Sequence, residues 1–163
     1  IRSVKRPAHP VDFGWVGDIE SINTEELLVL LERGIIPVLA PLSSDGSGQL
    51  LNTNADSIAA HVAIALAENS SFQVSLNLCF DLEGVMVDGK LYEVFSPQDF
   101  KIAKKDKQVS GGMIPKLDVG FMAVQAGVSP VRIVHPKDLY TQHSGTYLQL
   151  DYGRNYVRLV NKL

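Results

Sequence analysis

The apolar positions of the chain predict helices that alternate with short strands. Apolar residues at spacings of three and four predict amphipathic helices over residues 24–33, 55–67 and 113–126. The short, continuously apolar run Ile35–Ala40 is typical of a strand that is covered on both faces, as in parallel sheets. The remaining strands are predicted at Val74–Phe80 and Val131–Val134.

Turn and cap residues place the other elements. The first twenty residues predict two extended segments on either side of a turn at Ala8–Pro10. Ser96-Pro97 supplies a cap and a first helical residue, so we predict a short helix from there to the charged stretch Lys104–Lys107. This order of helices and strands predicts an α/β protein with a largely parallel sheet.

The length of the chain allows one compact domain or two small lobes. It has 163 residues, and the polar break Glu68–Ser71 is the best candidate for a boundary. We therefore predict one lobe over residues 1–71 and a second over 72–163.

Charge and cysteine content limit the classes of partner. The 15 basic and 18 acidic residues give a net charge of −3, and the basic ones are scattered. We therefore expect no nucleic acid and no membrane surface as partner. No apolar run approaches the ~20 residues that a membrane span needs. The single cysteine, Cys79, excludes an internal disulfide and favours a reducing, cytoplasmic location. Its place within a predicted strand indicates a small buried apolar side chain.

Gly111-Gly112-Met113-Ile114-Pro115-Lys116 is the first candidate for a binding loop. Glycines let backbone N–H groups approach a ligand, and the start of a helix adds unpaired donors and positive potential. Lys116, one turn into the predicted helix, suits phosphate oxygens. The alternative is an ordinary loop before a helix with a surface lysine, which the pattern alone favours.

Asn52-Thr53-Asn54-Ala55-Asp56 is the second candidate. Asparagine side chains offer a donor and an acceptor together, and Asp56 near a helix start can orient a lysine or bind a metal. The alternative is a helix cap, a role that asparagine and aspartate often take.

Other reactive side chains carry weaker signals. Asp81 follows the strand predicted at 74–80, and ligands in open α/β sheets gather beyond the carboxyl ends of strands. The histidines at 9, 61, 135 and 143 lack the spacing of metal ligands, so we predict no metal site. Neither a Gly-x-Ser-x-Gly elbow nor a P-loop occurs, which argues against the corresponding hydrolases and NTPases.

Taken together and in order, these segments resemble the acetylglutamate kinases of the amino acid kinase family, and most closely their Bacteroidetes-type branch. The resemblance extends from residue 1 to about 135, and Asn-x-Asn-Ala-Asp is its most discriminating motif. The matching stretches are residues 1–7 with 11–18, 36–41, 51–56 and 110–116.

The resemblance implies a three-layer α/β/α fold and phosphoryl transfer from ATP with Mg²⁺ to the γ-carboxylate of N-acetyl-L-glutamate. The product would be N-acetylglutamyl 5-phosphate, in arginine biosynthesis, and N-succinyl-L-glutamate remains an alternative substrate. A carboxylate nucleophile is already ionised at pH 7, so the reaction needs no general base.

The resemblance also implies a role for individual residues. Asn52 would contact the acylglutamate, with Asn54 beside it, and Asp56 would organise the catalytic lysines. Lys116 would bind the nucleotide phosphates and stabilise the transferring group. Asp81, with Gly111, Gly112 and Met113, would form the rest of the nucleotide site, although Phe80 replaces the small polar residue usual before Asp81.

Family members begin with a Lys-x-Gly-Gly loop, a second glycine-rich loop and a substrate-binding arginine, which this sequence does not contain. We therefore expect the chain to be the C-terminal portion of a longer enzyme and inactive by itself. A non-catalytic nucleotide-binding module is the alternative. The resemblance implies a homodimer, leaves control by arginine open, and provides no counterpart for residues 147–163.

Overall fold

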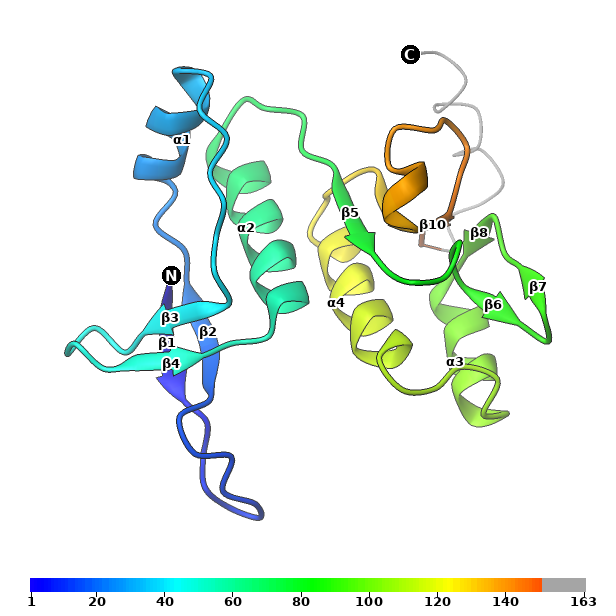
Figure 1. The fold of residues 1–163 in the computed structure, drawn as a ribbon, viewed down its shortest axis with the longest axis horizontal. Coiled ribbons are helices and arrows are strands. Elements are labelled where there is room, and N and C mark those ends of the chain that lie inside the picture. Colours follow the sequence, from blue (N-terminus) through cyan, green and yellow to red (C-terminus); the bar gives the residue numbers. More distant parts are fainter. Residues whose placement is uncertain (151–163) are drawn as a thin grey trace.

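The computed structural model describes residues 1–150. Two four-stranded sheets lie on either side of a pair of neighbouring helices, α2 (Ala55–Asn69) and α4 (Met113–Gln125) (Figure 1). The α/β class is thus confirmed. The predicted lobe boundary at residue 71 falls between the end of α2 and the first strand of the second sheet, and it stays a prediction. The apolar tail side chains Tyr152, Tyr156, Val157, Leu159 and Val160, which the sequence suggests pack on the surface, lie outside the described residues.

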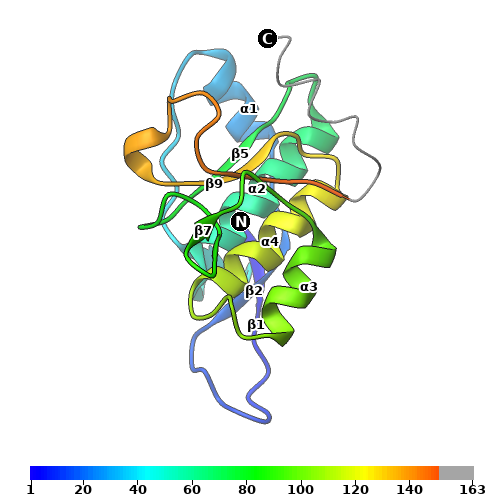
Figure 2. The ribbon, with the colours of Figure 1, turned by 90° about the vertical axis from the view of Figure 1, so that its right-hand side faces the viewer.

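The first sheet has the strand order β2-β1-β3-β4. Strands β1 (Arg2–Lys5) and β2 (Gly17–Ser21) pair antiparallel, which confirms the two predicted extended segments. Strand β3 (Leu42–Ser44) runs parallel to β1 and antiparallel to β4 (Leu50–Asn52). The loop 6–16 between β1 and β2 extends away from the helices (Figure 2).

The strand predicted at Ile35–Ala40 is absent, so that prediction is wrong. The segment pairs with no strand of the described residues, and the side chains of Ile36 and Val38 are 85% and 93% exposed. A continuous apolar run predicts a buried strand only where other polypeptide covers both of its faces. Nothing among residues 1–150 provides that cover.

The second sheet has the strand order β5-β9-β10-β8 and contains most of the core. Strand β5 (Leu76–Cys79) runs parallel to β9 (Val131–Val134), in agreement with the two strands predicted there. Strand β10 (Thr146–Leu148) is antiparallel to β9 and parallel to β8 (Val94–Phe95). Parallel and antiparallel pairs therefore both occur in it. A hairpin of β6 (Met86–Val87) and β7 (Lys90–Leu91) and a 3₁₀ turn at Pro136–Asp138 complete this part.

The helices begin and end close to where the sequence predicts them. Helix α1 (Glu25–Glu32) starts after Asn23, whose Oδ1 accepts from the Glu25 N–H at 3.0 Å. Helix α3 (Pro97–Lys105) opens with a capping box, in which the side chains of Ser96 and Asp99 each bond the other's backbone N–H. Among residues 1–150, no helix is both long and apolar enough to span a bilayer.

The core packs α2 and α4 against the second sheet. Inward-facing Leu76 and Leu78 alternate with outward-facing residues along β5, and Cys79 is exposed on the outer face. The prediction of a buried Cys79 is therefore wrong, because the period-two alternation of a strand places it opposite Leu78. Gly120 of α4 allows close packing, since a β-carbon there would lie 2.4 Å from Leu148.

Arg132 of β9 is a buried charge that no carboxylate of the described residues neutralises. Its Nε donates to Asn77 Oδ1 at 2.9 Å, and Nη2 donates to the Leu139 carbonyl at 2.7 Å. Nη1 reaches the carbonyls of Thr141 and Ser144 at 3.1 and 3.3 Å. The planar guanidinium thus holds the loop after β9 against the sheet through several carbonyl oxygens at once.

We expect Arg132→Lys to lower the free energy of unfolding by roughly 1–3 kcal/mol, because an ammonium cannot replace the fork and leaves buried carbonyls without donors. Urea denaturation measures the loss. Arg2→Lys, at an exposed ion pair with Glu20, is the control and should stay within about 0.5 kcal/mol of the wild type. Equal effects of the two changes would contradict the role given to Arg132.

Candidate functional site

An ion pair between Asp56 and Lys116 joins the two candidate loops. Lys116 Nζ lies 2.6 Å from Asp56 Oδ1, across sixty residues of sequence. The Lys116 side chain is only 9% exposed and that of Asp56 26% exposed. Lys116 is therefore not the surface lysine of the alternative interpretation. The orientation of a lysine by Asp56, one of the two roles that its position allowed, is present in the structure.

Local structure explains how both side chains reach this place. Asp56 is in the first turn of α2, and Lys116 is in the first turn of α4. The two helices pack side by side and begin at the same end of the pair (Figure 1). Their positive ends therefore lie together, and the Asp56 carboxylate is favourably placed at the N-terminus of its own helix.

Phe80 forms a second contact with the Lys116 ammonium. Nζ lies 5.6 Å from the centre of the Phe80 ring, within the range of a cation–π interaction. The ring also lies close to the glycine loop, since a β-carbon on Gly112 would stand 3.6 Å from it. In the sequence, Phe80 stands out only as an unusual neighbour of Asp81. In the structure, its ring helps to fix the direction of the Lys116 side chain.

The two asparagines of the second candidate differ in their surroundings. Asn54 is the N-cap of α2, with Oδ1 accepting from the N–H groups of Asp56 at 2.8 Å and Ser57 at 3.2 Å. The cap interpretation is thus confirmed, and the amide nitrogen of Asn54 remains available. Asn52 is exposed at the end of β4, where its N–H donates to the Trp15 carbonyl.

The glycine loop presents its backbone to solvent. Gly111 has a positive φ of 56° and nothing within 4 Å of the position of a β-carbon. Gly112 occupies the N-cap position of α4 without a capping side chain. The Met113 side chain is buried in the core, so a ligand could meet only its backbone.

Asp81 is exposed and directly follows Phe80 beyond the end of β5. No hydrogen bond or ion pair with residues 1–150 holds its carboxylate. The structure thus brings Asp56 and Lys116 into contact, with Phe80 and Gly112 beside them. Asn52, Asn54 and Asp81 lie next to this group along the chain and do not touch the lysine.

Possible metal ligands and a second, apolar cavity complete the description of the site and its surroundings. In the part of the chain that is described, no group of three or more His, Cys, Asp or Glu side chains could hold a metal ion. An apolar cavity of about 140 Å³ between the end of α4 and β10 lies at the other end of α4 from Lys116.

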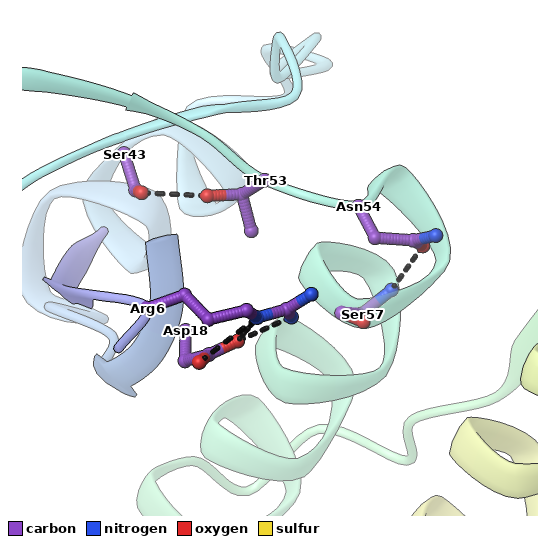
Figure 3. Close-up of polar contacts among 6 residues, drawn as sticks. All are labelled: Arg6, Asp18, Ser43, Thr53, Asn54 and Ser57. Atoms are coloured by element: carbon purple, nitrogen blue, oxygen red, sulfur yellow. Dashed lines mark hydrogen bonds and ion pairs between the residues drawn. The ribbon is translucent and has the colours of Figure 1, made fainter. Parts of the chain in front are cut away.

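An ion pair between Arg6 and Asp18, which the sequence did not predict, joins β1–β2 beside the start of α2. Arg6 Nε donates to the Asp18 carboxylate at 3.0 Å, and the hydrogen bond raises the pKa of Arg6, an effect that burial partly offsets. The sequence does show opposite charges on two predicted extended segments that a turn joins. It does not show the strand register that brings these two charges together. A polar cavity beside this pair reaches Asn54 (Figure 3).

We expect Asp56→Ala to lower the free energy of unfolding by roughly 1–3 kcal/mol, because it leaves the largely buried Lys116 ammonium without its acceptor. Urea denaturation with matched m-values measures this. Asp118→Ala breaks an exposed pair between α4 and Lys104 of α3, and it should change stability by less than about 1 kcal/mol. If Asp56→Ala cost no more than that control, the pair would not hold the helices together.

Comparison with known proteins places the chain in a family. Residues 2–135 match the model of the amino acid kinase family. A protein of Phocaeicola vulgatus named acetylglutamate kinase is 45% identical over 153 residues, 91% of this chain and 58% of that protein. One of Methanothrix thermoacetophila with the same name is 38% identical over 76% of this chain and 43% of its own length.

Solved structures give the same result. A crystal structure from Streptococcus mutans superposes with a TM-score of 0.73 at 34% identity, covering 84% of this chain and 52% of that one. An N-acetylglutamate synthase from Neisseria gonorrhoeae, at 22% identity and a TM-score of 0.74, shares the fold. The chain spans little more than half the length of the first of these relatives. Matching sequence over residues 2–135, together with this fold, shows that the chain belongs to the amino acid kinase family.

Proposed function

We propose that the chain forms the nucleotide-binding part, and a portion of the acyl-amino-acid site, of an N-acylglutamate kinase. The single observation that carries this is the Asp56–Lys116 pair. It connects the segment that carries Asn52 and Asn54 to the glycine loop, so that one ion pair joins the two segments suited to the two substrates. The curated relatives named acetylglutamate kinase support the choice of acceptor.

In this proposal Lys116 stabilises the charge that develops on the transferring phosphoryl group. Such transfers depend on positioning and on electrostatic stabilisation, and a lysine already oriented in the ground state costs no reorganisation. Asp56 and Phe80, both in contact with the ammonium, provide that orientation. When bound with the nucleotide, Mg²⁺ would supply further neutralisation of the phosphates.

In this proposal the glycine loop binds phosphate, and the acceptor carboxylate attacks without a general base. Backbone N–H groups around Gly111 and Gly112, at the positive end of α4, would bind phosphate oxygens. The γ-carboxylate of the acceptor is ionised at pH 7 and can attack directly. Asn52, exposed beside the start of α2, would bind the acceptor and direct that carboxylate toward Lys116.

A nucleotide-binding module without turnover is the second candidate, because the glycine loop and Lys116 would bind a nucleotide whether or not an acceptor is phosphorylated. Both candidates require nucleotide binding at Lys116. They differ in whether ADP is released when ATP and N-acetylglutamate are added together. Measurable release by this chain would exclude the module, and its absence with retained ATP binding would favour it.

We expect Lys116→Ala to weaken ADP and ATP binding about tenfold or more, since a charge-assisted contact to phosphate is lost. Isothermal titration calorimetry measures it. Lys104→Ala removes the same charge from an exposed position of α3 and should leave the affinity unchanged. Equal affinities of the Lys116 variant and the wild type would remove the proposed role of that lysine.

The acceptor is tested by Asn52→Ala. We expect this change to weaken the binding of N-acetylglutamate or N-succinylglutamate several-fold and to leave ADP binding unaffected, because Asn52 lies on the first sheet, apart from the glycine loop. Titration of the two acylglutamates in parallel identifies the acyl group. Binding of neither, with another amino acid or carbamate bound instead, would contradict an N-acylglutamate acceptor.

A further inference from the structure

A buried threonine at the start of β10 holds the loop that follows β5. Thr146 is fully buried, and its Oγ1 accepts from the Val85 N–H at 2.7 Å and donates to the Tyr92 carbonyl at 2.5 Å. These two bonds span 61 and 54 residues of sequence. We propose that Thr146 is a positioning residue for the bound nucleotide and that it acts through the loop that carries Asp81.

The threonine hydroxyl belongs to a closed cycle of three hydrogen bonds. The third bond runs from the Tyr92 N–H to the Val85 carbonyl at 3.0 Å. Val85 and Tyr92 lie on either side of β6 and β7, so the cycle closes the base of that hairpin (Figure 1). Each of the three residues donates one bond and accepts one, and bonds linked in this way polarise one another. Only a side chain that can both donate and accept completes the cycle.

Two glycines allow the threonine to come this close to the loop. Gly145 has a φ of +79°, and a β-carbon there would lie 2.4 Å from the Ile133 carbonyl oxygen. A β-carbon on Gly84 would lie 2.5 Å from Thr146 Oγ1. A side chain at either position would therefore displace the start of β10 or the end of the loop after β5.

The loop between β5 and the β6–β7 hairpin is thus fixed at both ends. At its start, the Phe80 N–H donates to the Val134 carbonyl at 3.0 Å. At its end, the fully buried Val85 donates its N–H to Thr146. Residues 81–83 between these two points are exposed. The position of the exposed residues therefore depends on two anchors, and one of these is the threonine hydroxyl.

Asp81 is the residue through which the loop would meet the nucleotide. It directly follows Phe80, whose ring lies 5.6 Å from Lys116 Nζ. A carboxylate repels phosphate oxygens and accepts hydrogen bonds, so its partners in a nucleotide are sugar hydroxyls or base N–H groups. The Asp81 loop would then hold the nucleoside end of the ligand, and Lys116 with the glycine loop its phosphates. This step rests on the proposed function, since it takes the ligand to be a nucleotide.

The test compares ADP with inorganic tripolyphosphate in calorimetric titrations of the 163-residue chain. Thr146→Val keeps the shape of the side chain but leaves the buried Val85 N–H without its acceptor. We expect ADP binding to weaken about tenfold and tripolyphosphate binding to stay within about twofold of the wild type, because phosphate groups alone do not reach the loop. General damage to the structure would lower both affinities together.

Two variants of threonine serve as rescue and control. Thr146→Ser keeps a hydroxyl that can donate and accept, so its affinity for ADP should stay within about twofold of the wild type. Thr141→Val makes the same change as Thr146→Val at an exposed threonine just before β10, and it should leave both affinities unchanged.

A double-mutant cycle tests whether the threonine acts through Asp81. Asp81→Asn by itself should weaken ADP binding. Combining it with Thr146→Val should weaken binding little further, because both changes remove the same contact with the ligand. Additive losses in the double variant would contradict an action through Asp81.

Hydrogen exchange of the wild type gives a measurement that depends on no variant. The Val85 amide should exchange as slowly as the paired amides of β9, because it is buried and held by Thr146. ADP should slow exchange at residues 81–83, and tripolyphosphate should not. Rapid exchange of the Val85 amide, or equal protection by the two ligands, would overturn the inference.

The remaining outcomes separate this inference from the proposed function. Unchanged ADP affinity in Thr146→Val, equal losses for ADP and tripolyphosphate, or a loss that Thr146→Ser does not restore would overturn the positioning role. ADP binding that depends on Lys116 but not on Thr146 would overturn this inference alone. ADP binding that does not depend on Lys116 would instead contradict the proposed function.

Discussion

The arrangement of the molecule depends on how one buried ammonium is compensated. Lys116 is almost entirely removed from solvent, and a charge in that position is tolerated only with a partner at hydrogen-bond distance. Asp56 is that partner, and it belongs to a different helix and a different candidate loop. The need to neutralise Lys116 therefore fixes α2 against α4 at their first turns and brings together segments that lie sixty residues apart.

This constraint also determines which groups are available for chemistry. The direction of the lysine side chain is set by a carboxylate at hydrogen-bond distance and by an aromatic ring near the ammonium. The exposed backbone of Gly111 and Gly112 lies at the start of the same helix. Rigid elements thus hold the charged groups, and the backbone of the glycine loop beside them faces solvent.

Local sequence patterns predicted most of the helices and strands correctly. They failed where the structure of a segment depends on what packs against it. Caps and periodicity predicted α2, α3 and α4 closely, because hydrogen bonds to the first turn and one-sided apolar faces are local properties. The run Ile35–Ala40 was wrongly predicted as a strand, since strand formation depends on a neighbour. Cys79 was misplaced because one residue of register moves a side chain to the other face. The position of Asp56 allowed it to orient a lysine, and the family resemblance pointed to Lys116. The pairing of Arg6 with Asp18 depends on a strand register that no spacing reveals.

The uncovered segment before β3 affects how the protein behaves in solution. Ile36 and Val38 stand almost fully exposed on an extended backbone whose N–H and C=O groups face no strand of the described residues. Such a segment is a template for edge-to-edge pairing with another chain. These exposed apolar side chains therefore favour association with further polypeptide, and such association grows with protein concentration.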